Sequence, residues 1–329
     1  MSISLGTFLM RQTVTAATPM VLAGIGELVA ELTGVIDIGI EGLMLSGALA
    51  AFLTALSSGS GTLALCAAIL VGMLMATVFA VATIALGVNQ IVVGTAINLL
   101  ALGLTGTIWM LYQTWAENHN LVIHLDAAQS FGRIHWPWLS RLPFFGPSFF
   151  DQYLLVYITI ALAAFAWWII HRTRLGLVIR GLGDSPATCA AAGIPILTAR
   201  TLATLFAGAC AGAAGAFLSI MQTHSFAQNM TNGQGFVVLA LVIFGRWTIG
   251  GLVGGCLLFG AMNSLQQTLQ TARYTSHSAL LHALRHLPVQ LFQMLPYLAA
   301  LIALAIFAKS RPGPKYLGQP WRPQGSANA

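Results

Sequence analysis

The chain has 329 residues, of which 57% are hydrophobic and only 7% are charged. Soluble globular proteins carry about 25% charged residues, so this sequence has too few polar residues to cover a surface that faces water. The composition therefore excludes a water-soluble enzyme, a nucleic-acid-binding domain and a disordered scaffold. The net charge of +6 is typical of a membrane protein whose cytoplasmic loops are basic.

Apolar runs of about 20 residues, the length that a helix needs to cross a membrane, recur along the chain. The runs are continuous and do not alternate with polar residues, which indicates helices and not a β-barrel. The sequence predicts an all-α, polytopic transmembrane bundle of about 8–10 spans with broken or re-entrant segments, formed by residues 1–329 as one domain. In chain order, the expected spans cover roughly residues 12–31, 39–57, 62–86, 91–111, 152–171, 199–222, 235–249, 250–269 and 288–308.

Basic residues gather in two segments and predict the orientation. The stretch of about 172–198, with Arg200 just after it, carries four arginines against one acid, and the tail of about 309–329 carries four basic residues and no acid. We expect both to be cytoplasmic, which places the segment of about 112–151 outside. An even number of expected spans separates the two basic segments, so the assignments agree. The side of the N-terminus depends on whether residues 34–42 re-enter the membrane.

Acids interrupt the apolar runs at residues 34–42, GVIDIGIEG, which contain Asp37 and Glu41; Glu27 and Glu31 lie one and two turns upstream. An acid in lipid is costly, so it faces a cavity, a partner or the interface. Two interpretations are open. The segment is either a short cytoplasmic turn with solvated acids or a broken helix that lines a transport pathway.

Uncharged amides form further polar clusters within the apolar runs. The candidate side chains are Asn89, Gln90, Asn98, Asn229, Gln234 and Asn263. Each either makes hydrogen bonds between helices or contacts solute. As a set, they suit a neutral, hydroxyl-rich solute better than an ion. The pairs Gly208/Gly212 and Gly251/Gly255 are interpreted as close helix packing.

No motif in the sequence predicts catalysis or a cofactor. The two lysines, Lys309 and Lys315, do not follow a glycine-rich phosphate-binding loop, so we expect no ATP to be bound by this chain. The four cysteines and eight histidines lack the spacing of a metal site and are interpreted as structural thiols and solvated rings. Energy then comes either from an ion gradient or from a partner ATPase.

Residues 180–194, RGLGDSPATCAAAGI, predict a short capped helix in the basic cytoplasmic segment. Asp184 or Ser185 is the expected N-cap, Pro186 suits the first turn and Gly193 ends the helix. A short helix there either docks a cytosolic protein or merely connects two spans. The residues assigned to docking are Asp184, Ser185, Pro186, Ala187, Ala190, Ala191 and Gly193.

Several stretches, taken in order, carry a family resemblance. They are residues 37–45 (DIGIEGLML), 89–98 (NQIVVGTAIN), 180–194, 229–236 (NMTNGQGF) with 243–247 (IFGRW), and 295–297 (LPY). On these the chain resembles the membrane permeases of ABC importers in the branched-chain amino acid, ribose and nucleoside group. It is most similar to the shorter subunit of the nucleoside or simple-sugar branch. Asp37 stands where that branch usually has Asn, and Ser185, Thr188 and Cys189 fall where its coupling loop is more acidic.

The resemblance implies a permease in the bacterial cytoplasmic membrane and no enzyme activity of its own. A periplasmic or lipoprotein binding protein would deliver the solute, a longer homologous permease would complete a heterodimer, and a separate ATPase would use ATP and Mg²⁺. Residues 184–193 would then form the helix that couples to the ATPase. The expected pathway residues are Asp37, Glu41, Asn89, Gln90, Asn98, Asn229, Gln234 and Asn263.

Alternative functions stay open from the sequence. Within the importer interpretation, the solute is a nucleoside, a simple sugar or a riboflavin-like molecule. Outside it, an ion-coupled transporter would use Asp37 or Glu41 as its titrating group.

Overall fold

The protein is described here by a computed structural model that covers residues 5–120, 132–135, 150–275, 289–299 and 313–321. Within these ranges, seven helices are long and apolar enough to cross a membrane, which confirms the predicted polytopic helical fold. They are α1 (Leu5–Leu32), α2 (Ile40–Ser58), α3 (Gly61–Ala80, extended by the π-helical turn Val81–Ala85), α4 (Gln90–Asn118), α6 (Leu154–Arg172), α9 (Ile196–Ala216, extended by the π-helical turn Phe217–Gln222) and α11 (Ile249–Thr275).

Shorter elements connect the long helices. These are β1 (Arg133–His135), β2 (Asp151–Tyr153), α7 (Arg174–Asp184), α8 (Pro186–Ala191), α10 (Gln234–Phe244) and α13 (Val289–Gln293). Strands β1 and β2 pair antiparallel, with Ile134 opposite Gln152. No strand was predicted in this region. Helix α4 also continues seven residues past the predicted end at 111, so the segment that we expect to lie outside begins later than predicted.

Helix α10 corrects the span predicted over residues 235–249. It has 11 residues and is therefore about 16 Å long, whereas the hydrocarbon core is about 30 Å thick. Arg246 and Trp247 adopt left-handed backbone angles, with φ of 55° and 53°, and this reverses the chain before α11. The prediction of a full span was wrong because continuous apolar character cannot reveal a reversal. Of the last expected span, 288–308, the structure describes only residues 289–299, which include α13.

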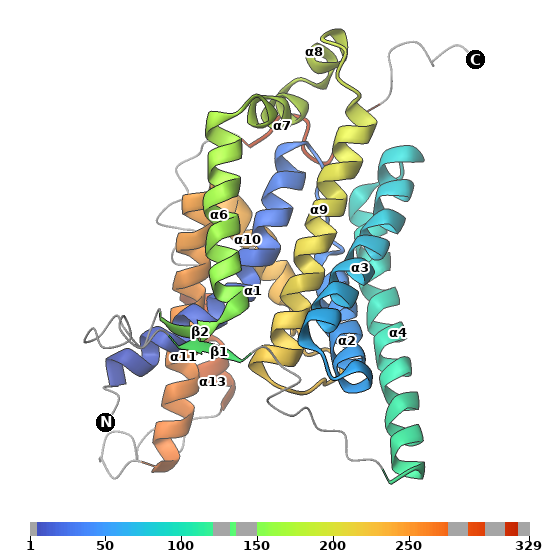
Figure 1. The fold of residues 1–329 in the computed structure, drawn as a ribbon. Helices are drawn as coiled ribbons and strands as arrows, with labels where there is room; N and C mark the ends of the chain where they lie inside the picture. Colours follow the sequence, from blue (N-terminus) through green and yellow to red (C-terminus); the bar gives the residue numbers. More distant parts are fainter. Residues whose placement is uncertain (1–4, 121–131, 136–149, 276–288, 300–312, 322–329) are drawn as a thin grey trace.

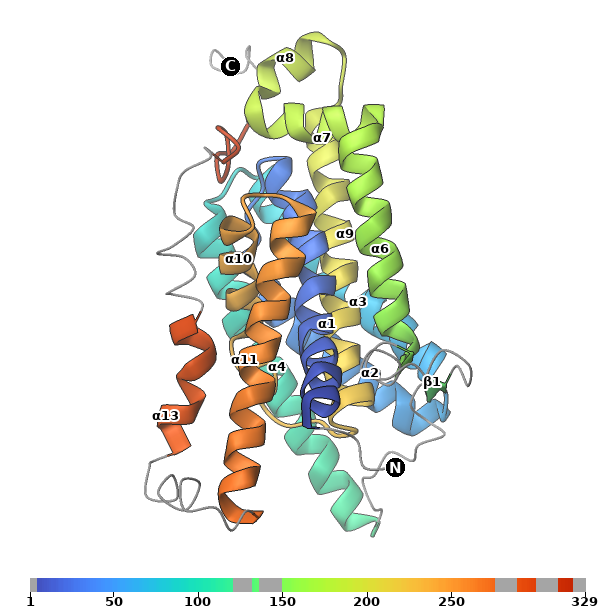
Figure 2. The same ribbon diagram turned by 90° about the vertical axis from the view of Figure 1, so that its left-hand side faces the viewer.

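The two ends of the molecule differ in what they carry. Figure 1 shows α7 and α8 at one end and the beginning of α1 with the β1–β2 pair at the other, and Figure 2 shows the same arrangement from the side. Tyr316 N–H donates to Gly183 O at 2.8 Å, so the basic tail and the basic α7–α8 segment lie at the same end. Their common placement agrees with the orientation argument, and it puts the start of α1 at the opposite end.

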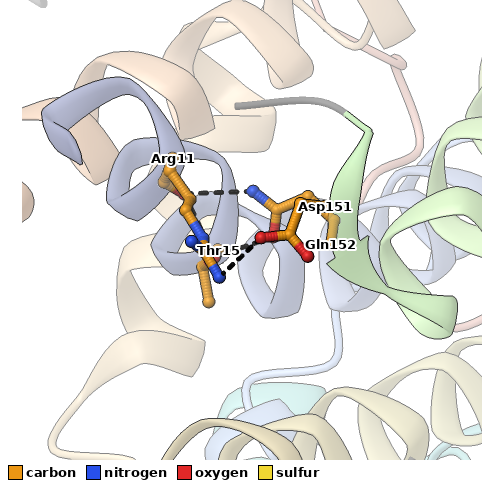
Figure 3. Close-up of polar contacts among 4 residues, drawn as sticks. All are labelled: Arg11, Thr15, Asp151 and Gln152. Carbon is orange, nitrogen blue, oxygen red and sulfur yellow. Dashed lines mark hydrogen bonds and ion pairs between the residues drawn. The ribbon is translucent and has the colours of Figure 1, made fainter. Parts of the chain in front are cut away.

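The start of α1 is tied to strand β2 by polar contacts (Figure 3). Arg11 forms a salt bridge with Asp151, with 3.1 Å between Nη2 and Oδ2. The buried Gln152 accepts from the Thr15 hydroxyl at 3.1 Å and donates to Arg11 O at 3.3 Å. The hairpin is thereby fixed on α1, directly before α6 begins.

The core of the bundle depends on glycines that let helix backbones touch. A Cβ on Gly47 would lie 2.6 Å from the Cα of Gly212, and one on Gly208 would lie 2.6 Å from the Gly72 oxygen. Helix α9 therefore packs backbone to backbone against both α2 and α3. This confirms the predicted role of Gly208 and Gly212. Gly255 likewise faces Leu241 of α10, with 3.0 Å from its built Cβ to Cδ2.

Large apolar side chains cover the outside of α4 and α6. Among those exposed are Leu99, Leu104, Met110, Phe165 and Trp168. A soluble protein rarely exposes so many such residues together, whereas lipid or a second membrane subunit covers them in a membrane protein.

We expect Gly212→Leu to unfold the helix crossing, because a side chain there has no room beside α3. Overpacking costs about 1–3 kcal/mol or more. Gly103→Leu is the matched control, since a Cβ on Gly103 meets no atom within 4 Å. Size-exclusion chromatography of heated detergent extracts measures both. Equal melting of the two variants would contradict the packing assigned to Gly212.

Candidate functional site

The candidate site is built around a break between two long helices. Helix α1 ends at Leu32 and α2 begins at Ile40. Gly34 has φ of +94°, a left-handed conformation that glycine adopts without strain. The N–H groups of residues 33–35 still reach carbonyls at the end of α1. Those of Ile36, Asp37 and Gly39 do not, and in a membrane each free N–H or C=O needs another partner. We call residues 33–39 the helix break.

Polar side chains from α1 and α4 supply these partners. Gln90 Oε1 accepts from Ile36 N–H at 2.8 Å, and Glu27 Oε1 accepts from Asp37 N–H at 2.9 Å. Asn98 bridges the end of the break, accepting from Gly42 N–H at 2.7 Å and donating to Ile38 O at 2.8 Å. Asp37 closes the turn itself by accepting from Gly39 N–H at 2.9 Å.

The break can approach α4 closely because glycines, which have no side chain, lie on both sides of the contact. A Cβ on Gly94 would lie 2.8 Å from Gly39 N, and one on Gly42 would lie 3.0 Å from Asn98 Oδ1. Sequence analysis singled out Asp37, Gln90 and Asn98 as pathway residues, and the structure brings them together around one short stretch of backbone. Their carboxylate and amide atoms hold that stretch in place.

Glu41 holds a second broken element, the short helix α10. Its two carboxylate oxygens accept from Gly233 N–H at 2.7 Å and Gly235 N–H at 2.6 Å. A carboxylate is favoured at a helix N-terminus, where free N–H groups and the helix dipole are positive. Gly235 must be glycine because its built Cβ lies 2.6 Å from the Glu41 Cα. Glu41 therefore joins the start of α2 to the start of α10.

Two acids of α1 belong to the same region, although they were not assigned a role from sequence. Glu27 binds the break, and Glu31 Oε2 accepts from the Trp247 indole N–H at 2.6 Å. Both are fully buried. The second oxygens of Glu27, Glu31 and Asp37 have no hydrogen-bond partner among the described residues. The available signal was the pair of acids one turn apart inside an apolar run, where acids are rare.

The other predicted pathway residues are placed differently. Asn89 is exposed and caps α4, accepting from Ile91 N–H at 2.9 Å. Asn229 is exposed, whereas Gln234, the first residue of α10, is half-buried. Asn263 precedes Ser264, whose hydroxyl donates to Leu9 O, so it lies about 27 Å along α1 from Glu27. The structure does not bring Asn263 to the break.

The predicted docking helix is present as α8, which projects from the end of the molecule (Figure 1). Pro186 occupies its first turn, and Gly193, with φ of +79°, reverses the chain after it. The residues Asp184, Ala187, Ala190, Ala191 and Gly193 are exposed. Ser185 and Thr188 share a hydroxyl hydrogen bond of 2.7 Å.

The inner side of α8 packs on its own support. Cys189 lies against Leu182 and Ile196, and burial raises the pKa of its thiol. The arrangement leaves one face of small side chains free to contact another protein. Among the described residues, no group of His, Cys, Asp and Glu is arranged to hold a metal ion.

Known proteins resemble the chain over almost its whole length. Residues 9–305 match the family of the branched-chain amino acid transport system permease component. The guanosine ABC transporter permease NupQ of Bacillus subtilis is 31% identical over 316 residues, which is 94% of each chain. The nucleoside ABC transporter permease NupC of Lactococcus lactis is 31% identical over 307 residues, covering 91% of this chain and 92% of the relative.

A sugar transporter subunit is similar as well. TsgC13 of Haloferax volcanii, provisionally named a glucose ABC transporter permease, is 34% identical over 267 residues, covering 80% of this chain and 78% of the relative. No solved structure matches the chain.

We expect Glu41→Gln to lower stability, because glutamine offers one acceptor oxygen to two N–H groups. Loss of one hydrogen bond to a charged group costs about 1.5–3 kcal/mol. Asp37→Asn is the control, since its remaining amide oxygen still accepts from Gly39 N–H. Thermal unfolding in detergent compares the two. An unchanged melting temperature for Glu41→Gln, or equal losses in both variants, would contradict the anchoring role of Glu41.

Proposed function

The chain belongs to the family of branched-chain amino acid transport system permease components, and from this premise we propose that it carries a nucleoside across the membrane. It is the multi-pass permease subunit of an ABC importer and is not itself an enzyme. Importers of this class work with an ATPase and a substrate-binding protein. Family membership disfavours an ion-coupled transporter, because the family draws its energy from the partner ATPase.

The state of the α10 N-terminus supports a neutral solute. In many transporters the positive end of a broken helix binds an anionic group of the substrate. Here Glu41 already occupies the Gly233 and Gly235 N–H groups, so that end has no free charge to offer. An uncharged nucleoside fits this environment, whereas a free amino acid or another carboxylate does not.

The names of the relatives favour particular candidates among the neutral solutes. NupQ and NupC, which are named for guanosine and for nucleosides, cover more than nine-tenths of this chain. A simple sugar is the second candidate, favoured by the 34% identity to TsgC13. The two classes share a ring with several hydroxyl groups.

The helix pair α7–α8 is the proposed docking site for the ATPase. The exposed alanines of α8 allow close approach of a partner. The first turn of α8 is fixed by Pro186 and by the Ser185–Thr188 hydrogen bond. ATP and Mg²⁺ would be bound by that partner. We further propose that this end faces the cytoplasm of a bacterium, because both basic segments lie there.

A second, longer permease is proposed to complete the pathway as a heterodimer. The outer face of α4 exposes many large apolar side chains, among them Leu99, Leu104 and Met110. The binding protein would deliver the solute at the opposite end, beside the start of α1.

The proposal is tested by uptake of tritiated guanosine in cells that carry this protein and its neighbouring subunits. We expect an inactive ATPase partner to abolish uptake, and an uncoupler to leave uptake intact while cellular ATP is maintained. The reverse pattern would overturn the importer mechanism. Uptake of glucose instead of guanosine, with the same ATP dependence, would select the sugar.

The docking role makes a separate prediction. Replacing both Ala190 and Ala191 with Glu should abolish ATP-driven uptake, because two charged side chains block close approach of the ATPase, while the amount of protein in the membrane stays the same. The control replaces the exposed Ser57 and Ser58 with Glu at the other end of the molecule. Normal uptake in the alanine variant would remove α8 from the interface.

A further inference from the structure

A buried arginine connects three separate segments at the α7–α8 end of the molecule. Arg200 lies one turn into α9 and only 2% of its surface is exposed. Its guanidinium donates to Thr33 O from Nε at 2.9 Å, to Gln319 O from Nη1 at 3.1 Å and to Leu182 O from Nη2 at 3.5 Å. No salt bridge to Arg200 exists in the described ranges. A buried charge without a counter-ion is costly, which points to a positional role for these three bonds.

Residues 313–321, which we call the C-terminal strap, run across the same joint. Tyr316 N–H donates to Gly183 O at 2.8 Å, and Gly318 N–H donates to Gly34 O at 3.0 Å. Trp321 packs on the cluster of Leu182, Cys189 and Ile196. The strap therefore bonds to the end of α7 and to the helix break, and its last residue covers the inner side of α8.

The strap also contacts the turn between α10 and α11. A Cβ on Gly313 would lie 2.5 Å from the outer edge of the Trp247 ring, and that indole binds Glu31 of α1. Gly183 in turn lies directly against the Leu32 carbonyl, where α1 ends. The last turn of α7, the break and the α10–α11 turn thus meet at one place.

We propose that Arg200 and the C-terminal strap transmit movement of the α7–α8 pair to the helix break, so that Arg200 is a positioning residue for coupling ATP hydrolysis to transport. This inference rests on the proposed function, in which α8 contacts the ATPase. Displacement of α8 moves the last turn of α7, and the Leu182 and Gly183 carbonyls pass that movement to Arg200 and the strap. Thr33 and Gly34 receive it at the start of the break.

The chemistry of the link favours transmission. The acceptor in all five hydrogen bonds is a backbone carbonyl, so no acceptor can yield by changing rotamer. The guanidinium is a planar fork with donors in fixed directions, whereas a lysine ammonium is a compact charge on a flexible stem. Arg200→Lys therefore keeps the charge but cannot hold the three carbonyls in one geometry.

The test measures transport efficiency in the complete transporter, reconstituted in vesicles with both permeases, the ATPase and the binding protein. For Arg200→Lys we expect normal assembly and normal basal ATP hydrolysis. The number of guanosine molecules transported per ATP hydrolysed should fall about tenfold, which is the factor that corresponds to one lost hydrogen bond to a charged group. The control is Arg172→Lys, because Arg172 is the exposed last residue of α6 and lies outside the α7–α8 pair.

Each outcome decides the inference. An unchanged ratio per assembled complex overturns it, even if less complex forms, because a merely structural role changes the amount and not the efficiency. If Arg200→Lys does not assemble, Trp321→Ala, which loosens the strap from α8, replaces it. A reduced ratio in that variant supports the link and a normal ratio overturns it.

A second readout separates this inference from the choice of solute. Spin labels are placed at Leu175→Cys in the first turn of α7, outside the docking residues 184–193, and at Val88→Cys, two residues before Gln90, which binds the break. The chain that carries them has the exposed Cys66 changed to Ser. Trapping with ATP and vanadate should leave the distribution of distances between the labels unchanged in the wild type. In Arg200→Lys the same treatment should broaden that distribution. Identical distributions in the two overturn the link. A wild type that fails to transport guanosine would instead refute only the proposed solute.

Discussion

The need to satisfy backbone groups inside a membrane governs this fold. The N–H and C=O groups of residues 33–39 must find partners within the protein. Carbonyls at the end of α1 accept from the N–H groups of residues 33–35, and side chains bond other groups of the break. Glu27, Gln90 and Asn98 each form a side-chain hydrogen bond with that backbone. Their positions on α1 and α4 then fix how closely these helices approach the break. The polar character of the region follows from this requirement before any solute is considered.

The same requirement explains the pairing of two broken elements. Helix α10 begins in the interior and needs an acceptor for its first N–H groups, and Glu41 at the start of α2 provides it. One carboxylate therefore stabilises both elements, and neither can shift far without the other. Around them, α9 packs on α2 and α3 through glycine backbones, which gives the broken elements a rigid wall on one side.

The sequence predicted the parts of the structure that depend on composition and local spacing. Apolar runs located the long helices, Pro186 and Gly193 marked the limits of α8, and the family resemblance identified the permease. The polar residues at 37, 41, 90 and 98 were singled out from sequence as pathway residues. The structure places them at the helix break and at the start of α10, and their pathway role stays a prediction. Their hydrogen-bond partners could not be predicted, because Glu41 and Gly233 are far apart in the chain and no local pattern records their contact.

The role of Arg200 could not be predicted for a similar reason. In the sequence it counts as one more basic residue near a cytoplasmic loop, whereas in the fold it is buried among carbonyls from three segments.

The ties at the two ends of α1 also constrain its relation to α6. At one end, Arg11 and Thr15 are bonded to Asp151 and Gln152, directly before α6 begins. At the other end, α6 leads through α7 to Gly183, which lies against Leu32 at the end of α1. The two helices thus form opposite sides of a closed frame with a fixed link at each corner. Such a frame resists sliding of one helix along the other. Any change between inward-open and outward-open states would then tilt α1 and α6 as a single body, and the hinges would lie elsewhere in the molecule.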